Sequence, residues 1–314
     1  LIPRGIPADR YYPINKKGFV WTLDAKGCAY GRLGMEPLAG ALGKMDLSGC
    51  GKNPRAVKPL LDFEWAGAEK LAAPRDQLAG FDKPIRDVAV DQEGNILVVD
   101  AKALKVFAPG GKSLAELREL ELGGKKIVLG APLSVCPAAE AVYLLAGPEK
   151  KDGKAVLLKL TREFAAPKAV WTLELNPAAR YLAVDASGQP AVVWVGSGNG
   201  PMTVTRVVDE GAQAGEVRHL GGLTAGLFAQ PELVAVDALG RLFVSDIVRG
   251  RYVRVNADGS GWLEGPRFGE KPGGPKGVCI RALAVDRARG YLYALRYDKA
   301  GIQTSMTIVG EQYM

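Results

Sequence analysis

One pattern returns at nearly even intervals along this chain: an apolar run that ends in Val-Asp, a short turn, and a second apolar run. The clearest copies read VAVDQEGNILVVD, LAVDASGQPAVVW, VAVDALGRLFVSD and LAVDRARGYLYAL. Repetition of this kind is typical of architectures in which similar structural units stand side by side and share one core. The aspartates that anchor these copies are Asp91, Asp185, Asp237 and Asp286.

The spacing of the anchors indicates two further copies. The first gap is 94 residues, about twice the later gaps of 52 and 49 residues. A weaker copy, LSVCPAAEAVYLL at 133–145, divides that long gap and carries Cys136 at the aspartate position. Another, FVWTLDAKGCAYG at 19–31, precedes them all and is anchored on Asp24. The sequence therefore predicts six units.

Each unit has room for four short strands, because apolar runs rich in Val, Leu and Tyr alternate with Gly, Asp and Asn turns. Units of roughly 40–50 residues with four strands are the blades of a β-propeller. We predict an all-β fold, a single six-bladed β-propeller of four-stranded blades over residues 1–314, with the ring closed by the N-terminal segment. The predicted blades are 18–66, 81–122, 130–175, 179–220, 231–265 and 279–314, the last completed by residues 1–17, with an insertion at 67–80.

Composition narrows the class of protein. Hydrophobic residues make up 47% of the chain, which is too many for a disordered protein. We expect no transmembrane segment, because no run of about 18 uncharged apolar residues occurs. The net charge of +7 is spread without a block of like charges, which argues against nucleic acid as the partner. The chain begins at Leu1 rather than Met, from which we expect removal of a leader and export to the periplasm or the cell exterior, with a cytoplasmic location left open.

The four cysteines form no C-x-x-C motif, so zinc ribbons and thioredoxin-type redox motifs are excluded. Cys28 and Cys50 bracket a glycine-rich segment. A disulfide between these two in an oxidising compartment and a set of four free, buried thiols remain equal alternatives.

Two segments carry a family resemblance. FDKPIRDVAVDQEGNILVVD (81–100) and LFAQPELVAVDALGRLFVSD (227–246) resemble the repeats of NHL-type six-bladed propellers. The Asn/His–Arg turn usual after the second strand of that repeat is replaced here by DAKALKVF and DIVRGRYVRV. The resemblance implies a ring of six blades, and members of the family range from RNA- and protein-binding modules to lyases and lactonase-like hydrolases. The matching positions include Phe81, Pro84, Asp91, Gly94 and Asp100, and Phe228, Pro231, Asp237, Gly240 and Asp246.

Metal and catalytic chemistry is restricted by the histidine content. Propeller enzymes of the lactonase and amidating-lyase types, which this chain resembles in shape, hold a metal in the central channel through His, Asn, Asp or Glu. The single histidine, His219, excludes a three-His site and leaves no basis for a Ser-His-Asp triad. We expect the repeat aspartates to cap turns rather than bind metal, and we assign no catalytic residue or cofactor. A calcium site built from oxygen ligands stays open, because calcium needs no nitrogen ligand.

An arginine recurs five residues before the anchor in three units, as Arg86, Arg180 and Arg281, and Glu232 takes that position in the fifth unit. Equivalent positions in a propeller lie around one mouth of the channel. Guanidinium groups suit carboxylate or phosphate, so one hypothesis is an anionic ligand bound by these arginines. The structural alternative is ion pairing with the carboxylates expected at the same end, which are Asp87, Asp100, Glu232 and Asp246.

Loops after the second strands should surround the same mouth and present Arg249, Arg251 and Tyr297 for recognition. From these features we expect a non-catalytic binding or scaffolding module that recognises a protein partner, a larger complex or an anionic ligand at one face. A channel-centred hydrolase or lyase of the lactonase-like type, using carboxylates and calcium, is the alternative. A third candidate is an RNA-binding NHL domain, which requires a contiguous basic face with exposed aromatics.

Overall fold

The computed structural model consists of β-strands and turns, and no helix occurs among the described residues, so none there could cross a membrane. The side-chain contacts used below all lie between residues 81 and 264. The described residues are 22–23, 28–33, 41–46, 61–62, 77–78, 81–82, 86–108, 111–148, 152–197, 202–222, 226–246, 249, 251–267, 279–286, 291–297 and 303–310.

The central part of the chain forms antiparallel sheets of four strands, each in chain order. The first of them contains β6 (Asp87–Val90), β7 (Ile96–Val99), β8 (Leu104–Phe107) and β9 (Ser113–Leu117). The next contains β12 (Pro132–Pro137), β13 (Ala141–Ala146), β14 (Ala155–Thr161) and β15 (Ala169–Leu175). Then come β16 (Ala179–Asp185), β17 (Ala191–Ser197), β18 (Thr203–Asp209) and β19 (Ala214–Gly221). The last of these sheets contains β20 (Pro231–Val236), β21 (Leu242–Asp246), β22 (Arg251–Val255) and β23 (Trp262–Arg267).

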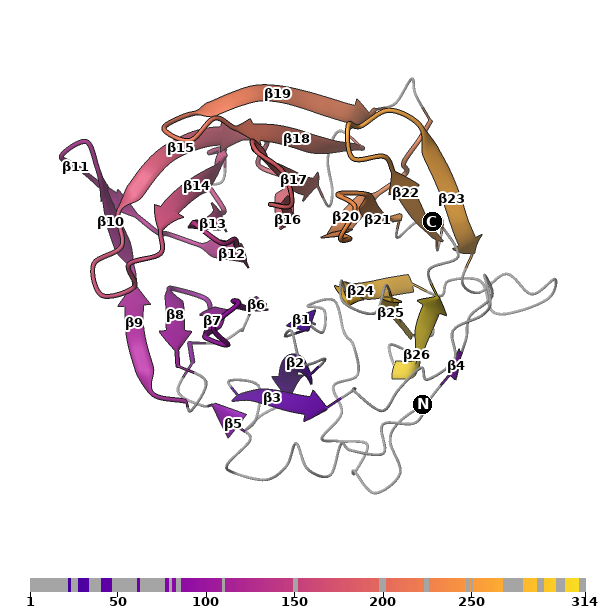
Figure 1. The fold of residues 1–314 in the computed structure, drawn as a ribbon, viewed down its shortest axis with the longest axis horizontal. Coiled ribbons are helices and arrows are strands. Elements are labelled where there is room, and N and C mark those ends of the chain that lie inside the picture. The colour runs from indigo at the N-terminus through magenta and orange to yellow at the C-terminus, as the bar shows by residue number, and fades with distance from the viewer. Residues whose placement is uncertain are drawn as a thin grey trace.

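Figure 1 shows these sheets side by side around a common centre, with their first strands innermost and their fourth strands outermost. The observed arrangement confirms the predicted all-β class and the four-stranded units. One element was not predicted. A hairpin of β10 (Glu119–Leu122) and β11 (Lys125–Val128) projects outward between sheets β6–β9 and β12–β15.

The outer strands near the chain ends differ from the prediction. We expected residues 18–66 to supply all four strands of the first unit and residues 1–17 to complete the last. Instead, β4 (Leu61–Asp62) pairs with β26 (Gln303–Gly310), in the sheet that also contains β24 (Cys279–Asp286) and β25 (Tyr291–Tyr297). The sheet of β1 (Thr22–Leu23), β2 (Cys28–Leu33) and β3 (Ala41–Asp46) takes β5 (Gln77–Leu78) as its fourth strand. A local strand pattern does not say which open edge a strand will join, and residues 1–17 lie outside the described residues.

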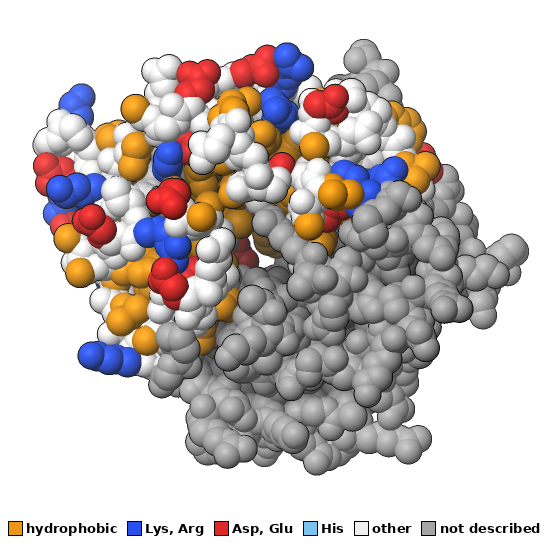
Figure 2. All heavy atoms as spheres, viewed as in Figure 1, with side chains coloured by type: hydrophobic (Ala, Val, Ile, Leu, Met, Phe, Trp, Pro, Cys, Tyr) orange, Lys and Arg blue, Asp and Glu red, His pale blue; other side chains and the backbone are white. Residues whose placement is uncertain are grey.

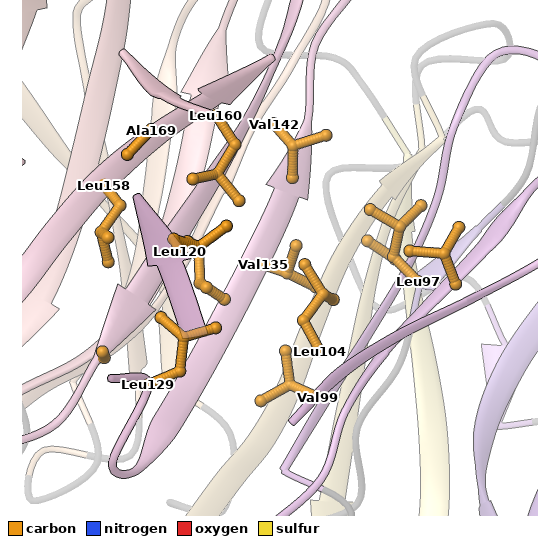
Figure 3. Close-up of a cluster of buried hydrophobic side chains, with 14 residues drawn as sticks. Leu97, Val99, Leu104, Leu120, Leu129, Val135, Val142, Leu158, Leu160 and Ala169 are labelled. Carbon is orange, nitrogen blue, oxygen red and sulfur yellow. The ribbon is translucent and has the colours of Figure 1, made fainter. Parts of the chain in front are cut away.

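The core lies between neighbouring sheets. Every residue of β7 and of β13 is buried, because these second strands are covered on both faces by adjacent sheets. Burying each leucine or valine side chain contributes roughly 1.5–3 kcal/mol. Figure 3 shows one such cluster, in which Leu120 and Leu129 from the β10–β11 hairpin region join apolar side chains of sheets β6–β9 and β12–β15.

The three repeat aspartates whose side chains are described cap their turns as predicted. Asp91, Asp185 and Asp237 each accept a hydrogen bond from the backbone N–H two residues later, at 2.9–3.0 Å. Two of these turns contain a glycine with positive φ, Gly94 at 83° and Gly240 at 74°, a conformation that favours glycine. The repeat motif therefore encodes tight strand connections.

Candidate functional site

The recurring arginines mark a structural irregularity in the innermost strands. The pairing register of β16 skips Arg180, that of β24 skips Arg281, and that of β20 skips Glu232 and Leu233. A β-bulge leaves the extra residue unpaired and re-aims its side chain away from the regular alternation. The sequence register was therefore informative, because equivalent positions of three innermost strands carry the same bulge.

Arg86 and Arg180 lie near each other although sheet β12–β15 stands between their strands. The Nη1 atom of Arg180 donates to the carbonyl oxygens of Pro177 at 2.7 Å and Ala179 at 2.8 Å. Burial lowers the pKa of Arg86, and the positive charge of Arg180 lowers it further, with Asp100 acting in the opposite direction. These effects place two guanidinium groups within electrostatic reach of each other in a partly buried region.

The carboxylates expected to pair with these arginines serve other groups. Asp100 is fully buried and accepts three backbone N–H groups at 2.9–3.0 Å, and Lys105 Nζ lies 3.0 Å from it. Asp246 is also fully buried and accepts two backbone N–H groups at 3.0 Å. Glu232 has an interaction of its own. Among the described residues, no ion pair joins Arg86 or Arg180 to any of the expected partners.

Asp87, the first residue of β6, links three innermost strands. Its Oδ2 accepts hydrogen bonds from the Ser134 hydroxyl and from the backbone N–H of Val135 at 2.9 Å, both in β12. The Ser134 hydroxyl in turn accepts the backbone N–H of Leu182 in β16, at 3.2 Å. Because Leu182 occupies an acceptor site of that hydroxyl, the Ser134 proton is directed at the Asp87 carboxylate.

Burial raises the pKa of Asp87 to about 6, although hydrogen bonds from Ser134, Val135 and Val88 oppose the shift. Asp87 nevertheless keeps some exposed surface, whereas Ser134 is 1% exposed. Of the two residues, Asp87 is the less buried, and the Ser134 hydroxyl orients its carboxyl group. A carboxyl group with this pKa populates both protonation states near neutral pH and can accept or return a proton.

Of the loop residues predicted to recognise a partner, Arg249 and Arg251 have described side chains, and both make contacts within the protein. Arg251 is 1% exposed, donates from Nη2 to the Leu227 carbonyl at 2.9 Å and pairs with Glu264. Arg249 donates from Nη1 to the same carbonyl at 3.1 Å. Both arginines therefore anchor the segment that leads into β20. The side chains of Tyr297 and Arg281 lie outside the described residues.

The cysteine and histidine expectations have separate outcomes. Cys136 is a free thiol, and the Cys28–Cys50 alternative lies outside the described side chains. His219 is exposed on the outer strand β19, where its Nδ1 lies 3.0 Å from Thr205 Oγ1, as expected for a structural residue. Within the described ranges, no three His, Cys, Asp or Glu side chains form a group that could hold a metal ion.

An apolar hollow of about 270 Å³ lies away from the centre, between the β10–β11 hairpin and strands β13 and β14. Its one charged lining residue, Lys154, is 63% exposed and pairs with Glu174 at 2.6 Å. Catalysis needs polar groups that converge on one point, and this lining does not supply them. We therefore place the candidate site at Asp87.

Charges of both signs alternate over the described part of the face in Figure 2, and no continuous basic field appears on that part. RNA recognition would need such a field together with stacking aromatics. This arrangement gives no support to the RNA-binding alternative.

Sequence reasoning identified Asp87 only as a partner for arginine and did not identify Ser134. A signal for Asp87 was present, since the second unit alone has a carboxylate directly after the recurring arginine. Ser134 had no such signal, because it lies 47 residues from Asp87 and belongs to another sheet.

No family model matches the chain, and no curated protein matches it. Solved structures do. A gluconolactonase from Xanthomonas campestris superposes with a TM-score of 0.60, is 13% identical, and the match covers 98% of this chain and 96% of that one. For a luciferin-regenerating enzyme the TM-score is 0.58, the identity 12%, and the coverage 97% and 94%. For a virginiamycin B lyase from Staphylococcus aureus these values are 0.54, 12%, 96% and 88%.

These likenesses support a propeller-like fold and do not single out the NHL type. Our expectation of a non-catalytic scaffold was wrong, because the structures that share the fold are mostly enzymes. The expectation had relied on the scarcity of histidine. A buried carboxyl group with a raised pKa can transfer protons without histidine, and Asp87 is such a group.

Proposed function

We propose that this chain is a channel-centred hydrolase or lyase of the lactonase-like propeller type, with Asp87 as its proton-transfer group. The observation that carries the proposal is a carboxyl group with a pKa of about 6, on a residue that is not fully buried, held where three innermost strands meet. The propeller-like gluconolactonase and lyase structures add support by analogy of fold. We further propose six blades in a ring closed by the pairing of β4 with β26.

In the proposed hydrolysis, ionised Asp87 accepts a proton from a water molecule whose oxygen attacks the carbonyl carbon of a cyclic ester. The ring C–O bond then breaks, and protonated Asp87 returns the proton to the leaving oxygen. Ser134 is a positioning residue, because its hydroxyl holds the Asp87 carboxylate in place without itself being exposed. Among the described residues, no cluster of three His, Cys, Asp or Glu side chains could hold a calcium ion, and the proposed step uses the Asp87 carboxyl group alone.

The test is turnover of a panel of sugar lactones and cyclic peptide esters by the wild-type chain and by Asp87→Asn. Asn keeps the shape of the side chain but cannot accept the proton, so we expect kcat/KM to fall by about 10²–10⁴-fold. Asp258→Asn is the matched control, since Asp258 is an exposed turn residue that caps Ser260. Undiminished turnover in Asp87→Asn, or no turnover of any panel member by the wild type, would overturn the proposal.

A further inference from the structure

We infer that Arg86 and Arg180 together bind an oxyanion of the substrate, a carboxylate or a phosphate group, at the end of the innermost strands that carries Asp87. The inference rests on the proposed function, because it names the substrate class of the same centre. Separate observations on the two arginines also support it. Arg86 directly precedes β6 and Arg180 lies in β16, and these strands belong to the two sheets that flank β12–β15 (Figure 1).

Arg180 is a bulged residue, held at one end of its guanidinium group. Its Nη1 is occupied by the Pro177 and Ala179 carbonyls, at 2.7 and 2.8 Å. Its Nε and Nη2 have no partner among the described residues. A guanidinium group fixed in this way keeps two donors, and such a pair of N–H groups suits the two oxygens of an oxyanion.

Arg86 is partly buried, and its guanidinium group makes no hydrogen bond or ion pair with the described residues. Arginine in such a location is usually paired, because a desolvated charge without a partner is costly. Arg180 adds a second positive charge nearby. An oxyanion between the two groups would replace their repulsion with attraction.

The nearby carboxylates do not fill this role. Both oxygens of Asp87 accept hydrogen bonds, from Ser134, Val135 and Val88. Asp100 is occupied by three backbone N–H groups and by Lys105. The described residues therefore leave the positive charge of the two arginines for a ligand.

Arg86 directly precedes Asp87 at the start of β6. An oxyanion bound by Arg86 would therefore hold the ligand at the strand end that also carries the proton-transfer group. The fitting substrate carries an anionic group in addition to its hydrolysable or eliminable bond. A lactone or ester that bears a carboxylate or a phosphate meets both requirements.

The test measures binding directly by calorimetry at low salt, with succinate and inorganic phosphate as separate probes. We expect saturable binding of at least one probe, and the probe that binds identifies the oxyanion. Arg86→Gln and Arg180→Gln should each weaken that binding by at least about tenfold, the loss expected for a charged hydrogen bond. Arg218→Gln is the matched control, because Arg218 is 59% exposed on the outer strand β19 and pairs with Glu216.

Arg86→Gln decides the inference if Arg180→Gln fails to fold, since Arg180 also braces the turn before β16. Unchanged affinity in Arg86→Gln, or no binding of either probe by the wild type, would overturn the inference. Asp87→Asn separates the two proposals. It should bind the probe as well as the wild type does while losing turnover. Binding of a probe by a wild-type chain that turns over no panel member, or undiminished turnover in Asp87→Asn, would reject the proposed function alone.

Discussion

Two aspartates, the half-buried Asp87 and the buried Asp209, each accept a hydrogen bond from a hydroxyl group of a neighbouring sheet, yet their pKa values move in opposite directions. Asp87 receives the Ser134 hydroxyl, and burial raises its pKa to about 6. Asp209, the last residue of β18, receives the Tyr143 hydroxyl. Burial raises its pKa too, but hydrogen bonds led by that from Lys159 outweigh burial and lower the pKa overall.

The opposite pKa shifts arise because Asp209 is paired with a cation. Lys159 Nζ lies 2.7 Å from Asp209, and the Trp171 Nε1–H and the Gly211 N–H donate to the same carboxylate at 3.1 and 2.9 Å. Asp87 has neutral donors alone among the described residues. A carboxylate paired with a cation stays ionised and clamps two sheets together, whereas one without a cation remains able to exchange a proton.

The largest expected change in stability comes from removing the Asp209 carboxylate, which holds two sheets together. Asp209→Ala leaves Lys159, Tyr143 and Trp171 without their shared acceptor, so the free energy of unfolding should fall by about 3–5 kcal/mol, the cost of breaking a buried pair. Chemical denaturation measures it. Turnover per folded molecule should stay close to that of the wild type. A loss of stability below about 1 kcal/mol would contradict the role of a clamp.

The contributions of Asp87 and Asp209 to the free energy of unfolding should change with pH in opposite directions. Because the folded pKa of Asp87 is raised, the folded state binds more protons than the unfolded state between pH about 4 and 6. The Asp87 contribution therefore falls as pH rises through that window, by roughly 1–2 kcal/mol after allowing for partial exposure. Asp209 contributes stability that is lost as pH falls below about 4, because its folded pKa is lowered.

Thermal unfolding from pH 3 to 8 would measure both slopes. In Asp87→Asn the decline between pH about 4 and 6 should vanish, while the loss of stability at acid pH remains. Persistence of the decline in that variant would assign it to another group.

The smallest expected effect concerns Ser134. The hydrogen bond from its hydroxyl lowers the pKa of Asp87, so Ser134→Ala should move the lower limb of the kcat/KM profile from pH about 6 to a higher pH. We expect a decrease of kcat of less than about tenfold at pH 8, where Asp87 is ionised in both proteins. Ser245→Ala is a suitable control. Ser245 is as buried as Ser134, but it lies in sheet β20–β23, where its hydroxyl accepts a hydrogen bond from the Leu233 N–H. An unshifted profile would show that Ser134 does not act on Asp87.

Local chemistry made much of this fold predictable. The turn at Asp91 needs only the N–H groups that follow it, and the strand pairs of each sheet are neighbours in sequence. The recurrence of Arg86, Arg180 and Arg281 predicted a common position, and bulges at Arg180 and Arg281 are consistent with that equivalence. The anchoring role of Arg249 and Arg251 was not predictable, because their hydrogen bonds to the Leu227 carbonyl depend on a segment more than 20 residues earlier.

The sequence by itself determined the strands, the four-stranded units and the capped turns, because these depend on side-chain alternation and on donors a few residues away. Only the tertiary structure decided that β4 joins β26, that a hairpin projects at β10–β11, and that Ser134 meets Asp87. Those outcomes depend on which edges and faces become neighbours once the sheets pack. The pKa of Asp87 follows from the same packing, because desolvation and the nearest cation are properties of the assembled centre.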